Sequence, residues 1–393
     1  MRFASALNLD VPAAAPGEFR ALALGPLRVW PPVVLAPMAG VTNYPFRSLC
    51  REFGAGLYVS EMITAAGYLR GNARTHHLAS GHADERPRSV QIYGHDPHEV
   101  GEMARRLVAD GVEHLDMNFG CPVPKVTRHG GGSAIPVKPR LMAALVRAAV
   151  GGADGVPVTV KVRKGIHDTL LTYLDAGRVA EDEGAVAIGL HARTAAQLYS
   201  GSADWDAIAA LKASVRIPVL GNGDVWECWD ALRMMRQTRC DGVIVGRGCL
   251  KRPWLFAELA AVFDGRELAP PPRLGDVVRI MRDHAARLVA FFGERGGVLQ
   301  MRKWCGWYLT GFAGAAAARR MLCQMDSLAQ MDVVLDALDP TQPYPLAVLR
   351  TSVAKDGRAQ DRVALPAGYL DDRDDDTPPA ALDDALEPAL SGG

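Results

Sequence analysis

Residues 217–248 read IPVLGNGDVWECWDALRMMRQTRCDGVIVGRG, and this stretch decides the fold. Its two apolar runs, IPVL and GVIV, have the length and β-branched content of strands. Residues 226–236, between them, carry apolar side chains at helical spacing. A glycine-rich turn follows each run at once. A strand, a crossover helix and a second strand predict a parallel sheet, because parallel strands need a crossover.

Six more apolar runs of strand length precede this unit, at residues 33–36, 57–59, 89–92, 114–117, 158–162 and 186–190. Stretches with helical spacing separate most of them, for example residues 99–109, 139–150, 170–183 and 205–213. Eight such units predict an α/β fold, a (β/α)8 TIM barrel over residues 30–270. An open doubly wound sheet is disfavoured, because its first strand would precede GxGxxG and here PMAG (37–40) follows.

The chain on either side of the barrel has a different pattern. Residues 1–29 form an N-terminal extension. After the proline run at 270–272, helical spacing at 277–292, 298–309 and 315–330 predicts a small all-α domain over 272–340. Residues 356–393 hold ten acids and three bases, including DDRDDD at 371–376. We expect this last segment to be an acidic, disordered tail, because it holds too few apolar residues to order itself.

The net charge is zero, with 44 Lys and Arg against 44 Asp and Glu in 393 residues. A hydrophobic fraction of 49% with 22% charged residues excludes a wholly disordered chain and a fibre. The tail carries −7, so residues 1–355 carry +7, and +5 of this lies within 272–330. The zero balance therefore does not argue against a nucleic-acid partner, because the helical domain is basic.

Cysteine spacing and hydropathy indicate the compartment. The seven cysteines are an odd number without a CxxC pair, so they suggest neither a disulfide framework nor a metal site. No apolar run approaches the roughly 18–20 residues that cross a bilayer, and the N-terminus does not resemble a secretory signal. We expect a cytoplasmic protein that does not bind a membrane.

Polar and glycine-rich residues follow the predicted strands, where a barrel of this kind has its active site. Backbone N–H groups of glycine turns after the last two strands can approach a phosphate, although such glycines also serve tight turns. These turns hold Asn222, Gly223, Asp224, Gly246 and Arg247. Strand ends elsewhere carry Lys161, His191 and Gln91, which suit an anion or the polar edge of a heterocycle.

Cys121 stands apart from the other cysteines, because it follows a strand in the loop NFGCP (118–122). Flanking glycine and proline fix the loop and hold the thiol at the barrel mouth. The thiol can act there as nucleophile, acid or base. No His–Asp pair follows that suggests an acyl-transfer triad.

Seven separated motifs resemble those of the tRNA-dihydrouridine synthases, and most closely the bacterial DusB-like branch. They are LAPMAGVTNYPFR (35–47), DMNFGCPVPKV (116–126), VKVR (160–163), HART (191–194), PVLGNGD (218–224), GVIVGRG (242–248) and MRKWCGWY (301–308). The resemblance implies an FMN-dependent oxidoreductase that uses NADPH or NADH to reduce a tRNA uridine to 5,6-dihydrouridine. It also implies that reduced flavin gives hydride to uracil C6 while Cys121 protonates C5.

The resemblance assigns further residues by motif. Flavin contacts fall to Pro37, Met38, Ala39, Gln91, Lys161, His191, Asn222, Gly223, Asp224, Gly246 and Arg247. Substrate contacts fall to Asn118 and Arg193. The basic helical tRNA-binding domain, with Arg302 and Lys303 at its centre, is the candidate to contact the RNA backbone of the substrate. We expect a monomer. The sequence does not show which uridine is reduced.

Two other functions remain compatible with the residues. A flavin barrel that reduces a free small pyrimidine needs no basic helical domain. An RNA-binding protein with a vestigial barrel needs no flavin.

Glycine-rich residues 129–133 also suggest a mobile lid that carries Cys121.

Overall fold

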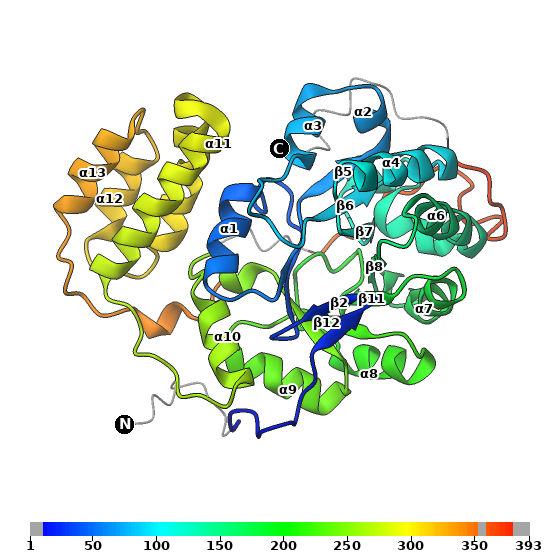
Figure 1. Ribbon diagram of the computed structural model, residues 1–393, viewed down its shortest axis with the longest axis horizontal. Helices are drawn as coiled ribbons and strands as arrows, with labels where there is room; N and C mark the ends of the chain where they lie inside the picture. Colours follow the sequence, from blue (N-terminus) through cyan, green and yellow to red (C-terminus); the bar gives the residue numbers. More distant parts are fainter. Residues whose placement is uncertain (1–10, 353–358, 380–393) are drawn as a thin grey trace.

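The computed structural model describes residues 11–352 and 359–379. Its centre is a parallel sheet in the order β4-β3-β13-β12-β11-β8-β7-β6-β5 (Figure 1). Its strands are β3 (Val33–Leu35), β4 (Leu57–Tyr58), β5 (Met62–Thr64), β6 (Ser89–Tyr93), β7 (His114–Phe119), β8 (Val158–Arg163), β11 (Ala187–His191), β12 (Val219–Asn222) and β13 (Gly242–Val245). Each predicted apolar run contains or overlaps one of these strands.

The barrel closes through its second strand, which is split into β4 and β5. Between the two halves, Val59 N donates to Leu35 O at 3.4 Å, on β3. Ser60 N then donates to Ser89 O at 3.2 Å, on β6. The second strand therefore bonds first to β3 and then to β6, and these bonds close the barrel. This closure confirms the predicted (β/α)8 barrel.

Amphipathic helices cover the outside of the barrel. They are α1 (Tyr44–Glu52), α2 (Ala65–Leu69), α3 (Ala73–Ala79), α4 (Pro97–Ala109), α6 (Pro139–Gly152), α7 (Tyr173–Asp182), α8 (Trp205–Ser214), α9 (Cys228–Thr238) and α10 (Leu255–Phe263). In α4, Val100, Met103 and Leu107 form one buried stripe at helical spacing. Among the described residues, no helix is long and apolar enough to cross a membrane.

Residues before the barrel close its amino end. Strands β1 (Leu22–Leu24) and β2 (Leu27–Val29) form an antiparallel hairpin. Leu22 and Leu24 are buried in one cluster with Leu220 and Ile244 of the barrel strands. The opposite, carboxyl end is left for loops.

The helical region consists of α11 (Leu274–Tyr308), α12 (Ala315–Leu322) and α13 (Leu328–Asp336), and lies beside α1 in Figure 1. The first two predicted helices are joined in α11, where Gly293 (φ 74°) makes a kink instead of a loop. The predicted helix over 315–330 is instead divided between α12 and α13.

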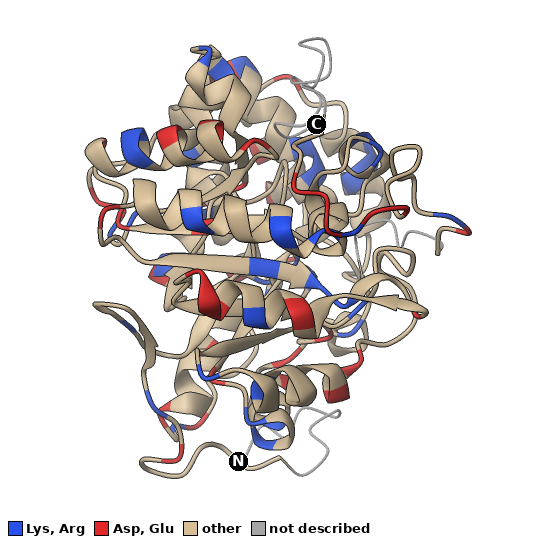
Figure 2. Ribbon diagram, turned by 90° about the vertical axis from the view of Figure 1, so that its right-hand side faces the viewer, with Lys and Arg blue, Asp and Glu red and all other residues tan. Residues whose placement is uncertain are grey.

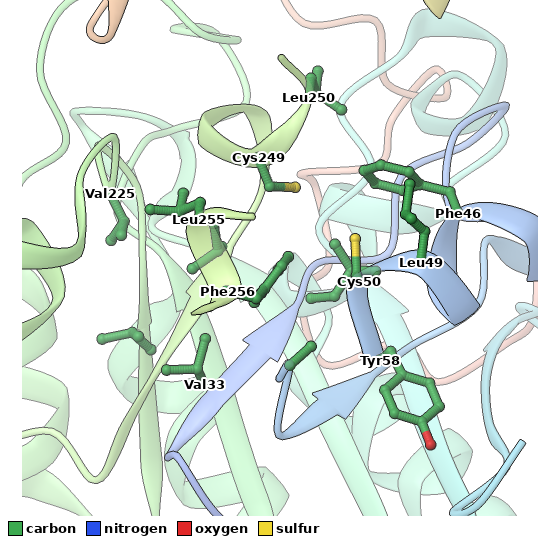
Figure 3. Packing of buried hydrophobic residues seen from close by; sticks show 14 of the residues in the cluster. Val33, Phe46, Leu49, Cys50, Tyr58, Val225, Cys249, Leu250, Leu255 and Phe256 are labelled. Carbon is green, nitrogen blue, oxygen red and sulfur yellow. The ribbon is translucent and has the colours of Figure 1, made fainter. Parts of the chain in front are cut away.

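Buried rings and ion pairs join the helical region to the barrel. Trp304 is fully buried, and its ring lies 4.4 Å from that of Phe46 on α1. Arg287 pairs with Glu52 at 2.6 Å. The other face of α1 packs on the barrel, where Figure 3 shows Cys50 turned toward Cys249 and Phe256. Helix α1 is thus held between the two parts.

The C-terminal segment 359–379 departs from the predicted solvated tail. It lies beside α6 in Figure 1, and Val363 and Tyr369 are buried against the barrel loops. In Figure 2 its acidic run passes over helices that carry basic positions. Lys138 pairs with Asp375, and Arg140 lies 3.7 Å from Asp374. Composition alone misled here, because two apolar side chains and a few ion pairs order the segment on a ready surface. The predicted tail residues 356–358 and 380–393 lie outside the described part.

Candidate functional site

A cavity of about 370 Å³ opens at the carboxyl ends of the barrel strands. Fourteen of the predicted site residues line it: Pro37, Met38, Ala39, Gln91, Asn118, Cys121, Lys161, His191, Arg193, Asn222, Gly223, Asp224, Gly246 and Arg247. They come from widely separated parts of the chain, and the barrel brings them together because the parallel strands all end on one side.

A chain of buried hydrogen bonds runs along β6, β7 and β8 toward Cys121. Thr159 Oγ1 lies 2.6 Å from Asp116 Oδ1, and Gln91 Nε2 lies 2.7 Å from Asp116 Oδ2. Asn118 Nδ2 donates to Gln91 Oε1 at 2.9 Å. The Cys121 backbone N–H donates to Asn118 Oδ1 at 3.0 Å.

Asp116 fixes which atoms donate and which accept along this series of hydrogen bonds. Burial raises the pKa of Asp116 to about 6, while bonds from Thr159 and Gln91 and the nearby Lys161 cation oppose this shift. Both carboxylate oxygens accept hydrogen bonds, as in the ionised form. An ionised carboxylate only accepts, so Gln91 must turn its amide nitrogen toward it. Gln91 Oε1 then faces Asn118, whose own oxygen is left for the Cys121 backbone. One carboxylate thus fixes two amides and the start of the Cys121 loop.

The same logic fixes a histidine tautomer at the far end of the chain. His114 Nε2 lies 3.0 Å from Thr159 Oγ1, and His114 Nδ1 lies 2.6 Å from Ser89 Oγ. Thr159 gives its hydrogen to Asp116, so it accepts from Nε2–H, and Ser89 donates to Nδ1. Burial lowers the pKa of His114 to about 4, which keeps the ring neutral.

Asp116→Asn is expected to slow Cys121-dependent chemistry by roughly tenfold, because small displacements of a reacting group are costly. Asparagine can donate as well as accept, so it no longer fixes the orientation of Gln91 and Asn118. Thr159→Val is the control, since it removes one bond to Asp116 and leaves the Gln91 bond. Steady-state rates of the two variants measure the difference. Equal rates for Asp116→Asn and the unaltered protein would show that the direction of the chain does not matter.

Cys121 lies part-buried in the cavity wall, and burial raises the pKa of its thiol. The thiol is therefore protonated at neutral pH. Arg163 supports the neighbouring backbone, with Nε 2.9 Å from Gly120 O and Nη1 2.8 Å from Leu198 O. A protonated thiol on a braced loop suits an acid better than a nucleophile.

Cations concentrate around the cavity. Burial, with the nearby Arg163 charge, lowers the pKa of Lys161, and Asp116 opposes this shift. Burial also lowers the pKa of His191, and the cations around it, Arg163 first, add to the effect. The imidazole is accordingly neutral beside a set of positive charges. Such a cavity favours an anionic ligand.

Arg193 lies next to Gly223 with a free donor. Its Nη2 pairs with Asp224 at 2.7 Å, and its Nε donates to Ser200 O at 3.1 Å. Nη1 is buried and, within the described residues, has no hydrogen-bond partner. A Cβ added at Gly223 would lie 2.6 Å from Ala203 Cβ and 3.5 Å from this nitrogen. Only glycine fits this close to Ala203, and the buried Arg193 Nη1 beside the turn is left to bond a ligand atom.

Two residues that were assigned to the flavin, Asp224 and Asn222, use their side chains to bond protein atoms. Asp224 uses its carboxylate for Arg193 and for Ala203 N, so it orients a cation. Asn222 Nδ2 donates to Ile244 O at 2.8 Å. Both side chains support the glycine turn from behind.

Arg302 and Lys303 do not line the cavity. Lys303 Nζ bonds to Gly40 O and to Gln300 Oε1, so it fastens the loop after β3 to α11. Arg302 pairs with Asp326 at 2.8 Å and donates to Met325 O. Both side chains therefore already bond to groups of the protein itself.

The sequence reasoning gave no role to Arg163, Tyr199 and Trp307, which line the cavity, or to Asp116, which bonds to Gln91 from behind the cavity wall. Asp116 and Arg163 each lie two positions from a predicted residue on the same strand, so strand alternation could have found them. Tyr199 and Trp307 lie outside the barrel strands, so strand alternation gives no signal for them. The Arg247 guanidinium lies 4.4 Å from the centre of the Tyr199 ring.

The glycine-rich turn after Cys121 is closely packed, which departs from the expected mobile lid. A Cβ at Gly131 would lie 2.1 Å from Tyr93 Oη, and one at Gly132 would lie 2.5 Å from Cys121 O. At Gly130 a Cβ would lie 3.0 Å from the ring of Tyr369. The glycines permit close approach on three sides.

Comparisons with known proteins agree with this geometry. The model of the family described as Dihydrouridine synthase (Dus) matches residues 34–342. A probable tRNA-dihydrouridine synthase of Mycobacterium tuberculosis H37Rv is 51% identical over 374 residues, covering 92% of this chain and 96% of its own. The Mycobacterium leprae protein of the same name is 49% identical, with 89% and 98% covered. tRNA-dihydrouridine synthase B of Pseudomonas syringae is 40% identical, with 78% and 90% covered.

Proposed function

Since this chain belongs to the dihydrouridine synthase family, we propose that it reduces a uridine of tRNA to 5,6-dihydrouridine with bound FMN and NADPH or NADH. One observation carries the proposal. The cavity that holds the Cys121 thiol also holds a part-buried lysine, an oriented amide and an arginine with an unused donor. Together these groups match a flavin on one side and a pyrimidine on the other.

The residues present fit FMN. Arg193, which the motif assigned to the substrate, would instead receive the FMN phosphate through Nη1, with the backbone around Gly223 and Gly246, and Arg247 adds positive charge. Lys161 and Gln91 would face the polar edge of the ring, where a cation stabilises negative charge. Pro37, Met38 and Ala39 would contact its apolar body. When bound, the flavin supplies the hydride.

Cys121 would supply the proton that the reduced pyrimidine needs. Hydride addition at C6 leaves negative charge at C5 and O4, and the protonated thiol is an acid of suitable strength. Asn118, which also anchors the Cys121 backbone, would orient the uracil. The base must leave its stack to enter the cavity, at a cost of about a few kcal/mol.

The test uses the purified protein and tRNA from a strain that lacks dihydrouridine. Mass spectrometry after incubation with NADPH should find one uridine converted, with a gain of two hydrogens. The same incubation with free uridine should give no product. Reduction of free uridine at an equal rate would favour the small-molecule alternative, and a colourless protein that cannot be loaded with flavin would favour the RNA-binding one.

Charges on the helical region would hold the tRNA backbone. Six of its nine bases bond to protein groups: Arg273, Arg279, Arg282, Arg287, Arg302 and Lys303. In the described residues, no such bond is recorded for Arg295, Arg319 or Arg320. We propose these three as phosphate contacts, in addition to Arg302 and Lys303.

Arg320→Ala is expected to weaken tRNA binding at low salt and to leave the rate at saturating tRNA unchanged. The slope of log K against log salt should fall by about 0.7–0.9, the contribution of one phosphate contact. Arg216→Ala is the matched control, because Arg216 is exposed in the loop before β12, at the opposite end of the barrel. Identical slopes for the two variants would remove Arg320 from the interface.

A further inference from the structure

Residues 359–379 cross three loops at the carboxyl end of the barrel, and we call this segment the strap. The family match ends at residue 342, so the strap lies outside it. Gln360 N donates to Ala196 O at 2.7 Å, in the loop after β11. Val363 is buried with Ile166 of β9 (Gly165–His167), which follows β8. The strap therefore lies across the loops after β8 and β11, which also bond to each other, with Ala196 N donating to Ile166 O at 2.9 Å.

Most strap contacts fall on the loop that carries Cys121. This loop contains α5 (Pro124–Thr127), the glycine turn and the 3-10 helix η1 (Gly132–Val137). Gln360 Nε2 reaches Pro122 O at 3.4 Å, next to Cys121. Arg373 Nε donates to Val137 O at 3.0 Å, at the other end of the loop. Both ends of the loop are thus fastened from outside the barrel.

Tyr369 fastens the middle. Its hydroxyl is buried and lies 3.2 Å from Gly130 O and 3.3 Å from Ala134 O. One hydroxyl hydrogen is shared between these two carbonyl groups, on either side of the glycine turn. The Lys138 ammonium lies 4.8 Å from the centre of the Tyr369 ring and pairs with Asp375, so within the described residues the strap supplies the anion for this buried cation.

The turn that Tyr369 fastens contacts Cys121 directly. Ser133 N donates to Cys121 O at 3.0 Å, and a Cβ at Gly132 would lie 3.0 Å from Cys121 Cβ. A shift of residues 130–134 is therefore passed to the thiol-bearing residue, because no gap separates them.

We propose that the strap holds Cys121 in its reactive position, with Tyr369 as the positioning residue. The proposal rests on the proposed role of Cys121 as the proton donor. Loosening the strap would leave flavin reduction intact and would slow proton delivery to the pyrimidine. It would also let the Cys121 loop open more often.

The experiment uses the flavin-loaded, full-length protein and four variants. Tyr369→Phe keeps the ring and loses the hydroxyl, and Tyr369→Ala loses both. Asp375→Asn removes the partner of Lys138. Asp376→Asn is the matched control, because it makes the same change of charge one position away, where no ion pair is recorded among the described residues.

The first readout is alkylation of Cys121 by iodoacetamide, followed by peptide mass mapping. Tyr369→Phe should speed it about fivefold, the effect of one net hydrogen bond, and Tyr369→Ala by more than about tenfold. Asp375→Asn should also speed it, and Asp376→Asn should not. Cys305 is buried in the helical region and reports global unfolding, so it should stay unlabelled throughout.

The second readout separates the two half-reactions. Flavin reduction by NADPH should keep its rate in all four variants. Dihydrouridine formation should fall by roughly 10–100-fold in Tyr369→Ala, with Tyr369→Phe in between and KM for tRNA unchanged.

Either of two results would overturn the proposal that the strap positions Cys121. One is Cys121 labelling at the original rate in Tyr369→Ala, and the other is an equal acceleration of labelling at Cys305. Labelling that responds as expected in a protein without activity on tRNA would instead reject the proposed function and keep the strap.

Discussion

Cys121→Ala is expected to lower dihydrouridine formation by roughly 10²–10⁴-fold, the usual contribution of a positioned general acid. The bound flavin should keep its absorbance, and its reduction by NADPH should keep its rate, because the thiol serves only the pyrimidine. Stopped-flow absorbance measures the first half-reaction, and mass spectrometry of the tRNA measures the second.

Cys323→Ala is the control for this substitution, because Cys323 is exposed in the helical region. It should leave both half-reactions unchanged. Retention of the full rate in Cys121→Ala would remove the thiol from the mechanism.

The pH profile tests the same role. Burial raises the pKa of the Cys121 thiol, so the acid form persists through neutral pH and is lost only above the ordinary thiol value of about 8.5. The rate of the pyrimidine step should fall on the alkaline side of that value. Cys121→Ser should be slower and should lose this limb, because a serine hydroxyl does not titrate there.

Arg193→Met is expected to weaken FMN binding by roughly 10²–10³-fold, since loss of one partner of a buried charge pair costs about 2–5 kcal/mol. The substitution removes the donor that faces Gly223 and leaves Asp224 unpaired in the cavity wall. Arg193→Lys should recover only part of the affinity, because one ammonium group cannot reproduce the several bonds of the guanidinium. Flavin fluorescence during titration of the apoprotein measures the affinity.

Arg147→Met provides the comparison. Arg147 pairs with Glu183 on the outer face of the barrel, away from the cavity. Its loss should leave FMN affinity unchanged. An unchanged affinity in Arg193→Met as well would assign the phosphate to other groups.

The barrel was predictable because strands buried on both faces appear as continuous apolar runs. Their carboxyl ends then identified most of the cavity wall. The split of the second strand was not predictable, since Ser60 and Glu61 interrupt its apolar pattern. The spacing predicts separate helices at 277–292 and 298–309, and it does not show that Gly293 joins them by a kink in place of a loop.

The remaining site features depend on contacts between distant residues. Charge alone assigned Arg302 and Lys303 to the substrate, and only the folded chain pairs Arg302 with Asp326 and Lys303 with Gly40. Tyr369 is 239 residues from Gly130, so no local pattern could join them. The acidic composition of residues 359–379 concealed the two apolar side chains that order the strap.

The contacts between α1 and α11 fix the position of the helical region relative to the cavity. Trp304 on Phe46, Arg287 on Glu52 and Lys303 on Gly40 leave little play between the helical region and the loop after β3. The distance from the proposed phosphate contacts on the helical region to the Cys121 thiol is consequently held constant. With tRNA bound at these contacts, the enzyme would select the uridine by its distance along the folded RNA, without reading the neighbouring bases.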